Sequence, residues 1–437
     1  MANLSRRRVL LGLQASAVAT LACRQPAHAG PRTIHPSGDP SGRADTQAIQ
    51  AALGAGQTAM LLPGASYRLA KRVVVRHGGT GVVCPQGTAR LLMLTGQGQF
   101  DLSTYEPREH FGERHVGILA QGIERPLLGG LDIRMQPSRP DEVRVCIPIA
   151  LRGCSQLEVG SVEMAGFRES WRAMFTLDSC HGGRVRRIFA HDCNPDTDVL
   201  PSLQLTAVCL DDNRTDGSSC RDITFDRVEY RNLLLGRRAL AKYGPQSDAV
   251  TVMSGGDTGL VFGLITGDGV GEALDCWGDR VTANLDVRNT QLYPVKLLYG
   301  ASHNHITARI DGTGLSAVYL GGTRALPERT PHGCNDNHIE VHARRVGALN
   351  PTVRPLSAGM PPTQPGIYFD NSSTFDPSDN VITGDIQGAP GANMRWVVAG
   401  STNGAGNRIT VSGGGFTESF SHWMAGARAP TIVQLRK

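Results

Sequence analysis

The sequence has few aromatic residues and few charged ones. Phe, Trp and Tyr make up 5% of the 437 residues, and Asp, Glu, Lys and Arg make up 19%. Apolar residues still reach 40%, which excludes a generally disordered chain, because disorder requires low hydrophobicity together with high net charge. The 53 glycines disfavour a helical protein, because each interior glycine costs a helix about 1 kcal/mol.

Long hydrophobic runs are absent as well. The run from Val9 to Cys23 has about 15 residues, short of the roughly 20 that a spanning helix needs. An arginine pair at its start (within Ser5-Arg6-Arg7-Arg8) and Ala27-His28-Ala29 at its end are typical of a bacterial twin-arginine export signal. We therefore expect a signal peptide over residues 1–29 and a periplasmic or secreted protein. A membrane anchor and lipidation at Cys23 are the alternatives.

The excess of positive charge is small and lies mostly in this segment. The formal charge of the whole chain is +5, and residues 1–29 hold four arginines and no acidic residue. Their removal lowers the charge by four, to +1. A nearly neutral mature chain argues against nucleic acid as a partner.

Cysteine pairs with C-x-x-C spacing are also missing, which argues against a zinc ribbon. The ten cysteines are too sparse for a small disulfide-stapled scaffold. We expect most of these thiols to pack as small hydrophobic side chains. A Cys146–Cys154 or a Cys180–Cys193 disulfide is the alternative.

What the sequence does have is repeats of short apolar segments. Four of them, with leading residues 24, 21 and 23 apart, are Val250-Thr251-Val252, Leu274-Asp275-Cys276, Val295-Lys296-Leu297 and Val318-Tyr319-Leu320. Further copies at about two periods, 42 residues before and 49 after, are Val208-Cys209-Leu210 and Ile367-Tyr368-Phe369, and an earlier one is Phe175-Thr176-Leu177. A second series is Asn304-His305-Ile306-Thr307, Asn337-His338-Ile339-Glu340, Asn380-Val381-Ile382-Thr383 and Asn407-Arg408-Ile409-Thr410, with Arg221-Asp222-Ile223-Thr224 as a weaker copy.

A period near 22 residues indicates a solenoid, because a propeller blade needs about 40–45 residues and the leucine-rich consensus is absent. The repeats predict an all-β, single-stranded parallel β-helix. Its coils would stack about 4.8 Å apart, with Val, Ile and Leu inside, files of outward residues, and an asparagine ladder at a turn. A β-sandwich is the alternative.

The Gly-rich segment Gly267–Gly271 lacks the Lys-Ser/Thr of a phosphate loop and is predicted to be a turn between coils.

Two neighbouring motifs near the start of the mature chain carry a family resemblance. They are Asp45-Thr46-Gln47-Ala48-Ile49-Gln50-Ala51-Ala52-Leu53 and Leu62-Pro63-Gly64-Ala65-Ser66-Tyr67. Together they resemble the N-terminal cap of the pectin-lyase-like, right-handed parallel β-helix superfamily, with one residue fewer in the second turn. The resemblance implies a β-helix domain over residues 30–437, with a capping helix within 30–70 and coils over 71–437. It also implies a polysaccharide or oligosaccharide substrate.

Carboxylates gather on neighbouring strands of the first repeat series. Asp275 is on an outward position, while Asp248 and Glu272 enter the adjacent strands. Two carboxyl groups on neighbouring rungs suit glycoside hydrolysis. The sequence therefore predicts a glycosidase with Asp275 and Glu272 as its catalytic pair and Asp248 as support or replacement. Trp277 would stack on a sugar ring, and Lys296 would hold a substrate carboxylate or neutralise Asp275.

A polysaccharide lyase or epimerase acting on a uronic acid is the first alternative. That chemistry needs a base, a cation and an acid, for which Lys296, Tyr319, Tyr293, His303 and Arg324 are the candidates. A non-catalytic glycan-binding or envelope scaffold is the second alternative. We expect no cofactor or metal, with calcium as an alternative if Asp178, Asp211 and Asp248 converge.

Known catalytic motifs of the superfamily are missing from this chain. It has neither the Gly-His-Gly and Arg-x-Lys of polygalacturonases nor the Arg-x-Pro-x-x-Arg of pectate lyases. The Asp-Pro-His of alginate epimerases is absent too. No catalytic residue can therefore be carried over from these families. Two Pro-rich stretches, 322–333 and 349–365, are predicted to be insertions that wall the substrate cleft.

Overall fold

The computed structural model describes most of the chain that follows the predicted signal peptide. The described residues are 30–94, 116–136, 147–167, 174–193, 204–211, 218–235, 246–321, 333–349, 365–370, 376–392, 394–401, 404–418, 420–423 and 427–434. The signal peptide, most of the two Pro-rich stretches, and Arg324 and Cys146 lie outside them. Within these ranges, no helix is long and apolar enough to cross a membrane.

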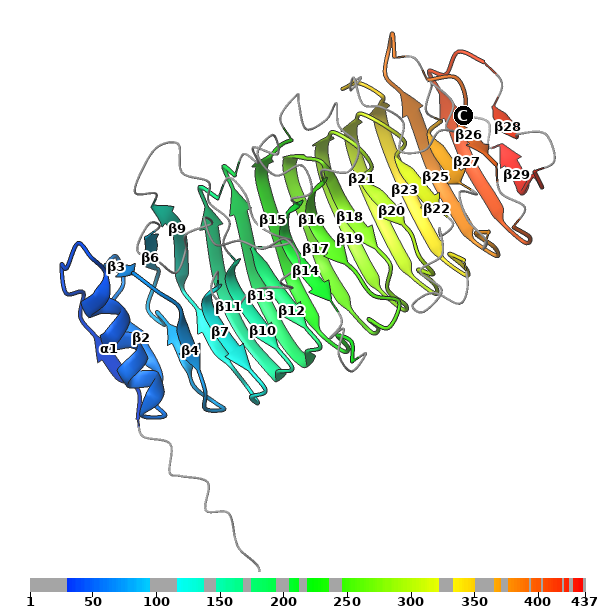
Figure 1. Ribbon diagram of the computed structural model, residues 1–437. Helices are drawn as coiled ribbons and strands as arrows, with labels where there is room; N and C mark the ends of the chain where they lie inside the picture. Colours follow the sequence, from blue (N-terminus) through cyan, green and yellow to red (C-terminus); the bar gives the residue numbers. More distant parts are fainter. Residues whose placement is uncertain are drawn as a thin grey trace, which may run out of the picture.

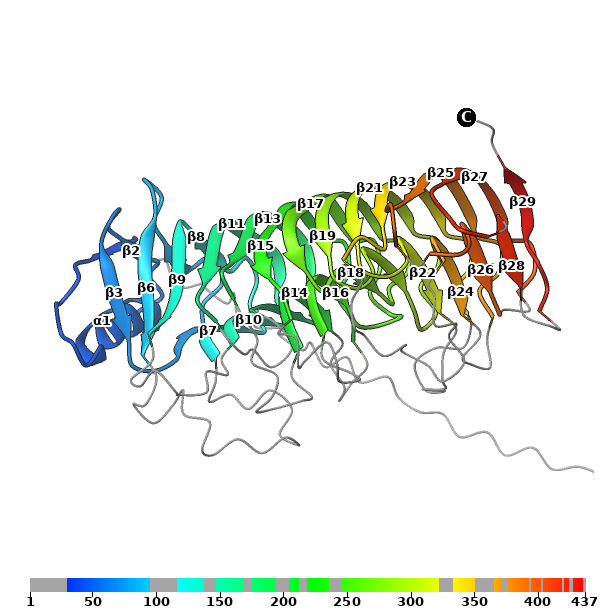
Figure 2. The same ribbon diagram turned by 90° about the horizontal axis from the view of Figure 1, so that it is seen from above.

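The described strands form two parallel sheets that face each other along an elongated molecule (Figures 1 and 2). Sheet A contains β1 (Arg32–Ile34), β2 (Ala59–Leu61), β3 (Ser66–Leu69), β5 (Gly81–Val83), β6 (Ala89–Leu94), β8 (Leu127–Gly129), β9 (Leu131–Gln136), β11 (Ser155–Ala165), β13 (His181–His191), β15 (Thr224–Leu233), β17 (Val261–Val270), β19 (Thr282–Thr290), β21 (His305–Thr313), β23 (His338–Val346), β25 (Val381–Gly388), β27 (Arg408–Gly414) and β29 (Thr431–Gln434). Sheet B contains β4 (Val73–Val75), β7 (Val116–Gln121), β10 (Ile147–Arg152), β12 (Phe175–Asp178), β14 (Gln204–Asp211), β16 (Gln246–Val252), β18 (Glu272–Cys276), β20 (Val295–Leu297), β22 (Val318–Gly321), β24 (Ile367–Asp370), β26 (Val398–Gly400) and β28 (Ser421–Trp423).

From β10 onward the chain alternates between the two sheets, so each turn around the molecule adds one strand to each; before β10, two or three successive strands join sheet A between the sheet B strands. Figure 1 shows the strands stacked side by side from the blue end to the red end. Alternation along sheet A strands such as β19 and β21 puts apolar residues inside and polar residues outside. This parallel β-helix confirms the predicted fold class and excludes the β-sandwich.

The predicted alignment of the sheet B strands is confirmed residue by residue. Val250 pairs with Leu274, Leu274 with Val295, and Val295 with Val318. The prediction is wrong, however, for the two long intervals of 42 and 49 residues, which were each expected to span two coils. Val208 pairs directly with Val250, and Val318 pairs directly with Ile367, so each interval is one coil with an insertion and not two coils.

Helix α1 (Arg43–Gly54) contains the first motif of the superfamily resemblance, and its polar residues bind backbone groups of the first coils. Asp45 Oδ2 accepts from Arg68 N at 2.8 Å. Thr46 Oγ1 accepts from Ala70 N at 3.0 Å. Gln50 accepts from Val74 N and donates to Val74 O. The helix therefore lies across the first strands of both sheets, with Ile49 and Leu53 buried. Figure 1 shows it at the N-terminal end of the described solenoid.

The second motif is fixed by its tyrosine. The Tyr67 hydroxyl donates to Ile34 O at 2.7 Å and accepts from Leu62 N at 2.9 Å. Tyr67 is fully buried, so this hydroxyl needs both partners. The motif residues thus join the first strands to one another.

The asparagines of the second repeat series form the expected ladder. Each side-chain oxygen accepts from the backbone N–H of the asparagine one coil earlier: Asn337 from Asn304 at 3.1 Å, Asn380 from Asn337 at 3.1 Å, and Asn407 from Asn380 at 3.0 Å. All four are buried at the bend that leads into sheet A. Backbone groups that a tight bend would leave unpaired are satisfied in this way.

The cysteines of the described residues form no disulfide and are all buried, as expected for small hydrophobic side chains. Cys180 and Cys193 form no disulfide, which removes that alternative.

The Gly-rich segment Gly267–Gly271 differs from its prediction as a turn between coils. Residues 267–270 are the end of β17, and Gly271 is the bend between β17 and β18.

Candidate active site

The three predicted acidic residues and Lys296 come together on the outer side of sheet B. Asp248 in β16 pairs in register with Glu272 in β18, and Asp275 pairs with Lys296 in β20. Carboxylate oxygens of Asp248, Glu272 and Asp275 lie within 4.8 Å of one another. We call these four residues the acid–lysine cluster.

Lys296 occupies the centre of the cluster. Its Nζ is 2.8 Å from Glu272 Oε2 and 3.0 Å from Asp275 Oδ2. Two carboxyl groups therefore share one ammonium group. The sequence left two roles open for Lys296, and in this structure it neutralises carboxylates of its own chain.

The cluster is closed off from solvent. Asp248 and Glu272 have no exposed surface, and Asp275 and Lys296 are 1% and 2% exposed. The sequence placed these residues on an open cleft, so their burial is a difference between expectation and structure. Desolvation makes ionised groups costly, which is why several charges persist here only by mutual pairing and hydrogen bonding.

Burial and like charges act on Glu272. Desolvation raises the pKa of its carboxyl group well above the usual range, and the charges of Asp248 and Asp275 raise it further. The Lys296 charge opposes this shift but does not cancel it. For Lys296 itself, burial lowers the pKa, but Asp275 and Glu272 outweigh burial and leave the pKa raised. The cluster thus favours a charged ammonium group on Lys296 and favours the protonated form of Glu272.

The two carboxyl groups bound to Lys296 differ in their second oxygens. Asp275 Oδ1 accepts from Trp277 Nε1 at 3.0 Å, so both of its oxygens are engaged. Glu272 Oε1 is buried and has no hydrogen-bond partner among the described residues. Asp275 is therefore fixed in place, whereas Glu272 keeps an oxygen free to exchange a proton.

An aromatic pair lies beside Asp275. The ring of Trp277 packs on Tyr299 with centroids 4.3 Å apart, and both residues are half-buried. Tyr299 has φ 52°, a left-handed conformation that is unusual outside glycine. Sequence reasoning missed Tyr299, although it follows Lys296 by only three residues.

The predicted tyrosines form a buried file next to the cluster. Tyr319 pairs with Lys296 in register, and its ring lies 4.8 Å from Tyr293 and 5.7 Å from Tyr368. The Tyr319 hydroxyl donates to Asp370 Oδ2 at 2.6 Å. Burial and the charge of Asp370 raise the pKa of Tyr319 far above its usual value, so this hydroxyl stays protonated. Asp370, which is buried beside these tyrosines, is a residue to which the sequence analysis assigned no role.

Two other predicted residues lie elsewhere. His303 is exposed at the turn before β21, where its Nδ1 lies 2.7 Å from Asp279 Oδ1. Arg324 falls outside the described residues.

The three acids proposed as a calcium site do not come together as a group. Asp178 pairs with Asp211, but Asp248 pairs with Thr206 and Glu272, so the acids that meet are Asp248, Glu272 and Asp275.

Comparison with known proteins adds little to this site. No protein-family model matches the chain, and no curated protein matches it. Solved structures similar to it include the A-modules of two mannuronan C-5 epimerases of Azotobacter vinelandii, AlgE4 and AlgE6, which are 12% and 11% identical. Each alignment covers 89% of this chain, with 95% of the first module and 93% of the second, at a TM-score of 0.37. Likeness at this level carries no information about chemistry. With its two parallel sheets and coil-by-coil register, the chain has a parallel β-helix fold.

Proposed function

We propose that this chain is an enzyme acting on a uronic-acid polysaccharide, and that it removes the proton next to the sugar carboxylate at the acid–lysine cluster. The outcome would be β-elimination or epimerisation. The observation that carries the proposal is the position of Lys296, whose ammonium group is held 2.8–3.0 Å from two buried carboxyl groups, with the pKa of one of them, Glu272, raised by burial.

The lysine favours this reaction over glycoside hydrolysis. Hydrolysis needs two carboxyl groups in opposite protonation states and a water molecule, but it does not need a cation. Removal of a proton next to a carboxylate builds negative charge on that carboxylate, and a fixed ammonium group in a dry site stabilises such charge strongly. Lys296 supplies this charge within the cluster.

The residues of the cluster have distinct roles in this proposal. The carbon–hydrogen bond next to the carboxylate breaks, and a carboxylate of the cluster takes the proton. In elimination, the electron pair forms a carbon–carbon double bond as the bond to the leaving oxygen breaks, and the protonated Glu272 supplies the proton for that oxygen. In epimerisation, the bond to the leaving oxygen stays intact, and the protonated Glu272 instead delivers its proton to the carbanion on the face opposite to the one that lost the proton. Asp275, with both oxygens engaged, positions Lys296.

Trp277 and Tyr299 mark the approach to the cluster, because they are the half-buried residues beside Asp275. A sugar ring that stacks on Trp277 would lie next to the carboxylate that the indole holds. The four cluster residues must become accessible for reaction, since they are 0–2% exposed. Charge stabilisation is strongest when water is then excluded again.

The test is incubation with a panel of uronate polymers and neutral polymers. Elimination gives an unsaturated product that absorbs in the ultraviolet, and epimerisation in heavy water places deuterium at the reacting carbon. We expect one of these signals with a uronate polymer and none with a neutral one. New reducing ends without ultraviolet absorbance or deuterium would instead establish a hydrolase, and no product from any polymer would favour a binding scaffold.

Substitutions tie the activity to the cluster. Lys296→Met and Glu272→Gln should each lower turnover at least 100-fold, in the range typical of lost acid–base or charge-stabilising groups. The matched control is Glu158→Gln, which makes the same chemical change at an exposed position of β11. Full activity of both cluster variants, with folding verified by circular dichroism, would refute the assignment.

A further inference from the structure

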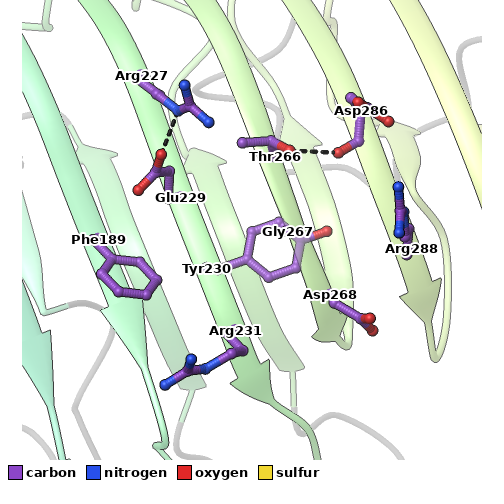
Figure 3. A pocket seen from close by; sticks show the side chains of 10 residues that line it. All are labelled: Phe189, Arg227, Glu229, Tyr230, Arg231, Thr266, Gly267, Asp268, Asp286 and Arg288. Atoms are coloured by element: carbon purple, nitrogen blue, oxygen red, sulfur yellow. Dashed lines mark hydrogen bonds and ion pairs between the residues drawn. The ribbon is translucent and has the colours of Figure 1, made fainter.

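The outer face of sheet A carries a groove that is separate from the acid–lysine cluster. Two pockets of about 320 and 280 Å³ lie on it and share Asp286 and Arg288, so they form one continuous depression. Its lining residues come from successive sheet A strands, from β13 to β25 (Figure 3 shows the first pocket). We call this depression the sheet A groove.

Most charged side chains in the groove are already paired. At one end, Arg227 binds Glu229, and Arg231 binds Asp192 at 2.9 Å. At the other end, Arg344 binds Asp311 at 3.0 Å, and His342 binds Asp385 at 2.5 Å. These groups neutralise one another, and little of their charge is left for a ligand.

The middle of the groove is different. Arg288 and Arg309 are exposed, and the side chain of neither forms an ion pair or hydrogen bond with any described residue. The exposed carboxylate of Asp286 likewise has no side-chain partner in the described part of the chain. Asp286 and Arg309 are register partners on adjacent strands, and Arg288 is two residues along the strand from Asp286. Two arginines and one aspartate therefore occupy neighbouring positions of β19 and β21, with Asp286 and Arg288 lining both pockets and Arg309 lining the second.

Each of these groups has a preferred ligand chemistry. A guanidinium group binds a carboxylate through two parallel hydrogen bonds. A free carboxylate accepts hydrogen bonds and so binds hydroxyl groups. A ligand that satisfies the three together carries a carboxylate and hydroxyl groups on neighbouring positions, as an acidic sugar does.

We propose that the sheet A groove binds a uronic-acid oligosaccharide, with Arg288 and Arg309 holding sugar carboxylates and Asp286 holding hydroxyl groups. It is a second, non-catalytic site, because its residues face outward from sheet A and the cluster faces outward from sheet B. The link to a polymer rests on the proposed function, whereas the preference for an acidic sugar rests on the groove itself. Such a site would hold one part of a chain while another part reacts.

The test measures binding by calorimetry in the Lys296→Met protein, in which turnover of the ligand is expected to be at least 100-fold slower. The probes are a short oligogalacturonate and a neutral oligosaccharide of the same length. We expect binding of the uronate alone, with affinity falling as salt rises. Arg288→Gln and Arg309→Gln should each weaken binding about tenfold, the usual effect of losing a charged hydrogen bond. Asp286→Asn should weaken it less.

The matched control is Arg184→Gln, because Arg184 is an exposed arginine of sheet A that lies outside both pockets and is paired with Asp226. This variant should bind as the parent does. Equal affinity of the Arg184, Arg288 and Arg309 variants, or equal binding of the neutral oligosaccharide, would overturn the proposal. Groove binding with no activity on any polymer would refute the proposed function alone, and activity without groove binding would refute this inference alone.

Discussion

At the scale of single residues, Glu272 determines how the buried cluster responds to pH. Its pKa is raised by burial and by the neighbouring carboxylates, so the folded protein holds a proton that the unfolded chain releases above about pH 4.3. Because the folded state then binds more protons, the free energy of unfolding falls as pH rises from there towards the raised pKa. This contribution is present in full only below the unfolded pKa.

We therefore predict that Glu272→Gln makes stability less dependent on pH. Glutamine does not titrate, so the fall in the free energy of unfolding between about pH 5 and pH 8 should be smaller in the variant than in the parent. Urea denaturation at both pH values measures the difference. Parallel pH profiles would contradict the raised pKa of Glu272.

Gly267 shows a steric requirement at one position. A Cβ atom there would lie 2.1 Å from Tyr230 O and 2.7 Å from the Tyr230 ring, which is buried in the adjacent coil. We predict that Gly267→Ala lowers the free energy of unfolding by about 1–3 kcal/mol through overpacking. The matched change is Gly54→Ala, where nothing lies within 4 Å, and its stability should be unchanged or slightly higher. Equal urea midpoints for the two variants would show that Tyr230 does not constrain this position.

The sequence predicted which residues of the site are neighbours better than it predicted their side-chain contacts and their burial. Repeat spacing put Asp275 beside Lys296, because a period-2 strand and a fixed coil length determine which residues are neighbours. It did not show that Glu272 would reach the same lysine, or that Trp277 would bind Asp275, because side-chain contacts within a rung leave no periodic trace. Burial was missed for a related reason, since alternation shows which face a residue takes but not what covers that face.

At the scale of elements, the bends depend on a few polar side chains. Asn337 is fully buried and makes three kinds of contact: it accepts from Asn304 N, and it donates to Ala301 O and to Asn380 Oδ1. Removal of the amide would leave buried backbone groups of neighbouring coils without partners, at about 1–3 kcal/mol for each group.

Asn337→Ala should therefore cost at least about 2 kcal/mol of unfolding free energy. Asn284→Ala is the control, since Asn284 is exposed and makes one hydrogen bond, to Gly263 O. That change should stay within about 0.5 kcal/mol. Chemical denaturation compares the two, and a cost for Asn337→Ala no larger than the control would mean that the ladder adds no stability.

The role of α1 as a cap stays a prediction, although its position at the N-terminal end of the described coils is the one that a cap would occupy. Ile49 is fully buried against the first coils, so Ile49→Asp should cost about 3–5 kcal/mol by burying an unpaired charge. If the helix covers an open end, its loss should also expose strand edges and promote association, detectable by light scattering. Gln47→Asp, on the exposed face of the same helix, should do neither. Loss of stability without any association would count against a capping role.

At the scale of the whole molecule, the fold was predictable because it is nearly one-dimensional. Each coil contacts mainly its neighbours, so one repeat length and one strand pattern specify the stack. The pattern failed where insertions lengthen a coil, as between Val208 and Val250, because a period inferred from equal spacing cannot distinguish one long coil from two short ones.

The same geometry predicts an uneven distribution of stability along the axis. The strands of the central coils bury their inward residues completely, and Phe225 and Phe262 stack there with centroids 4.9 Å apart. At the C-terminal end, the strands Ser421–Trp423 and Thr431–Gln434 are half-buried or exposed throughout. Because stability in a stacked array comes from contacts between neighbouring repeats, an end coil opens more easily than a central one. Hydrogen exchange followed by mass spectrometry should therefore show the slowest exchange in β15–β19 and the fastest in β28 and β29. Uniform exchange along the axis would mean that the solenoid opens only as a single unit.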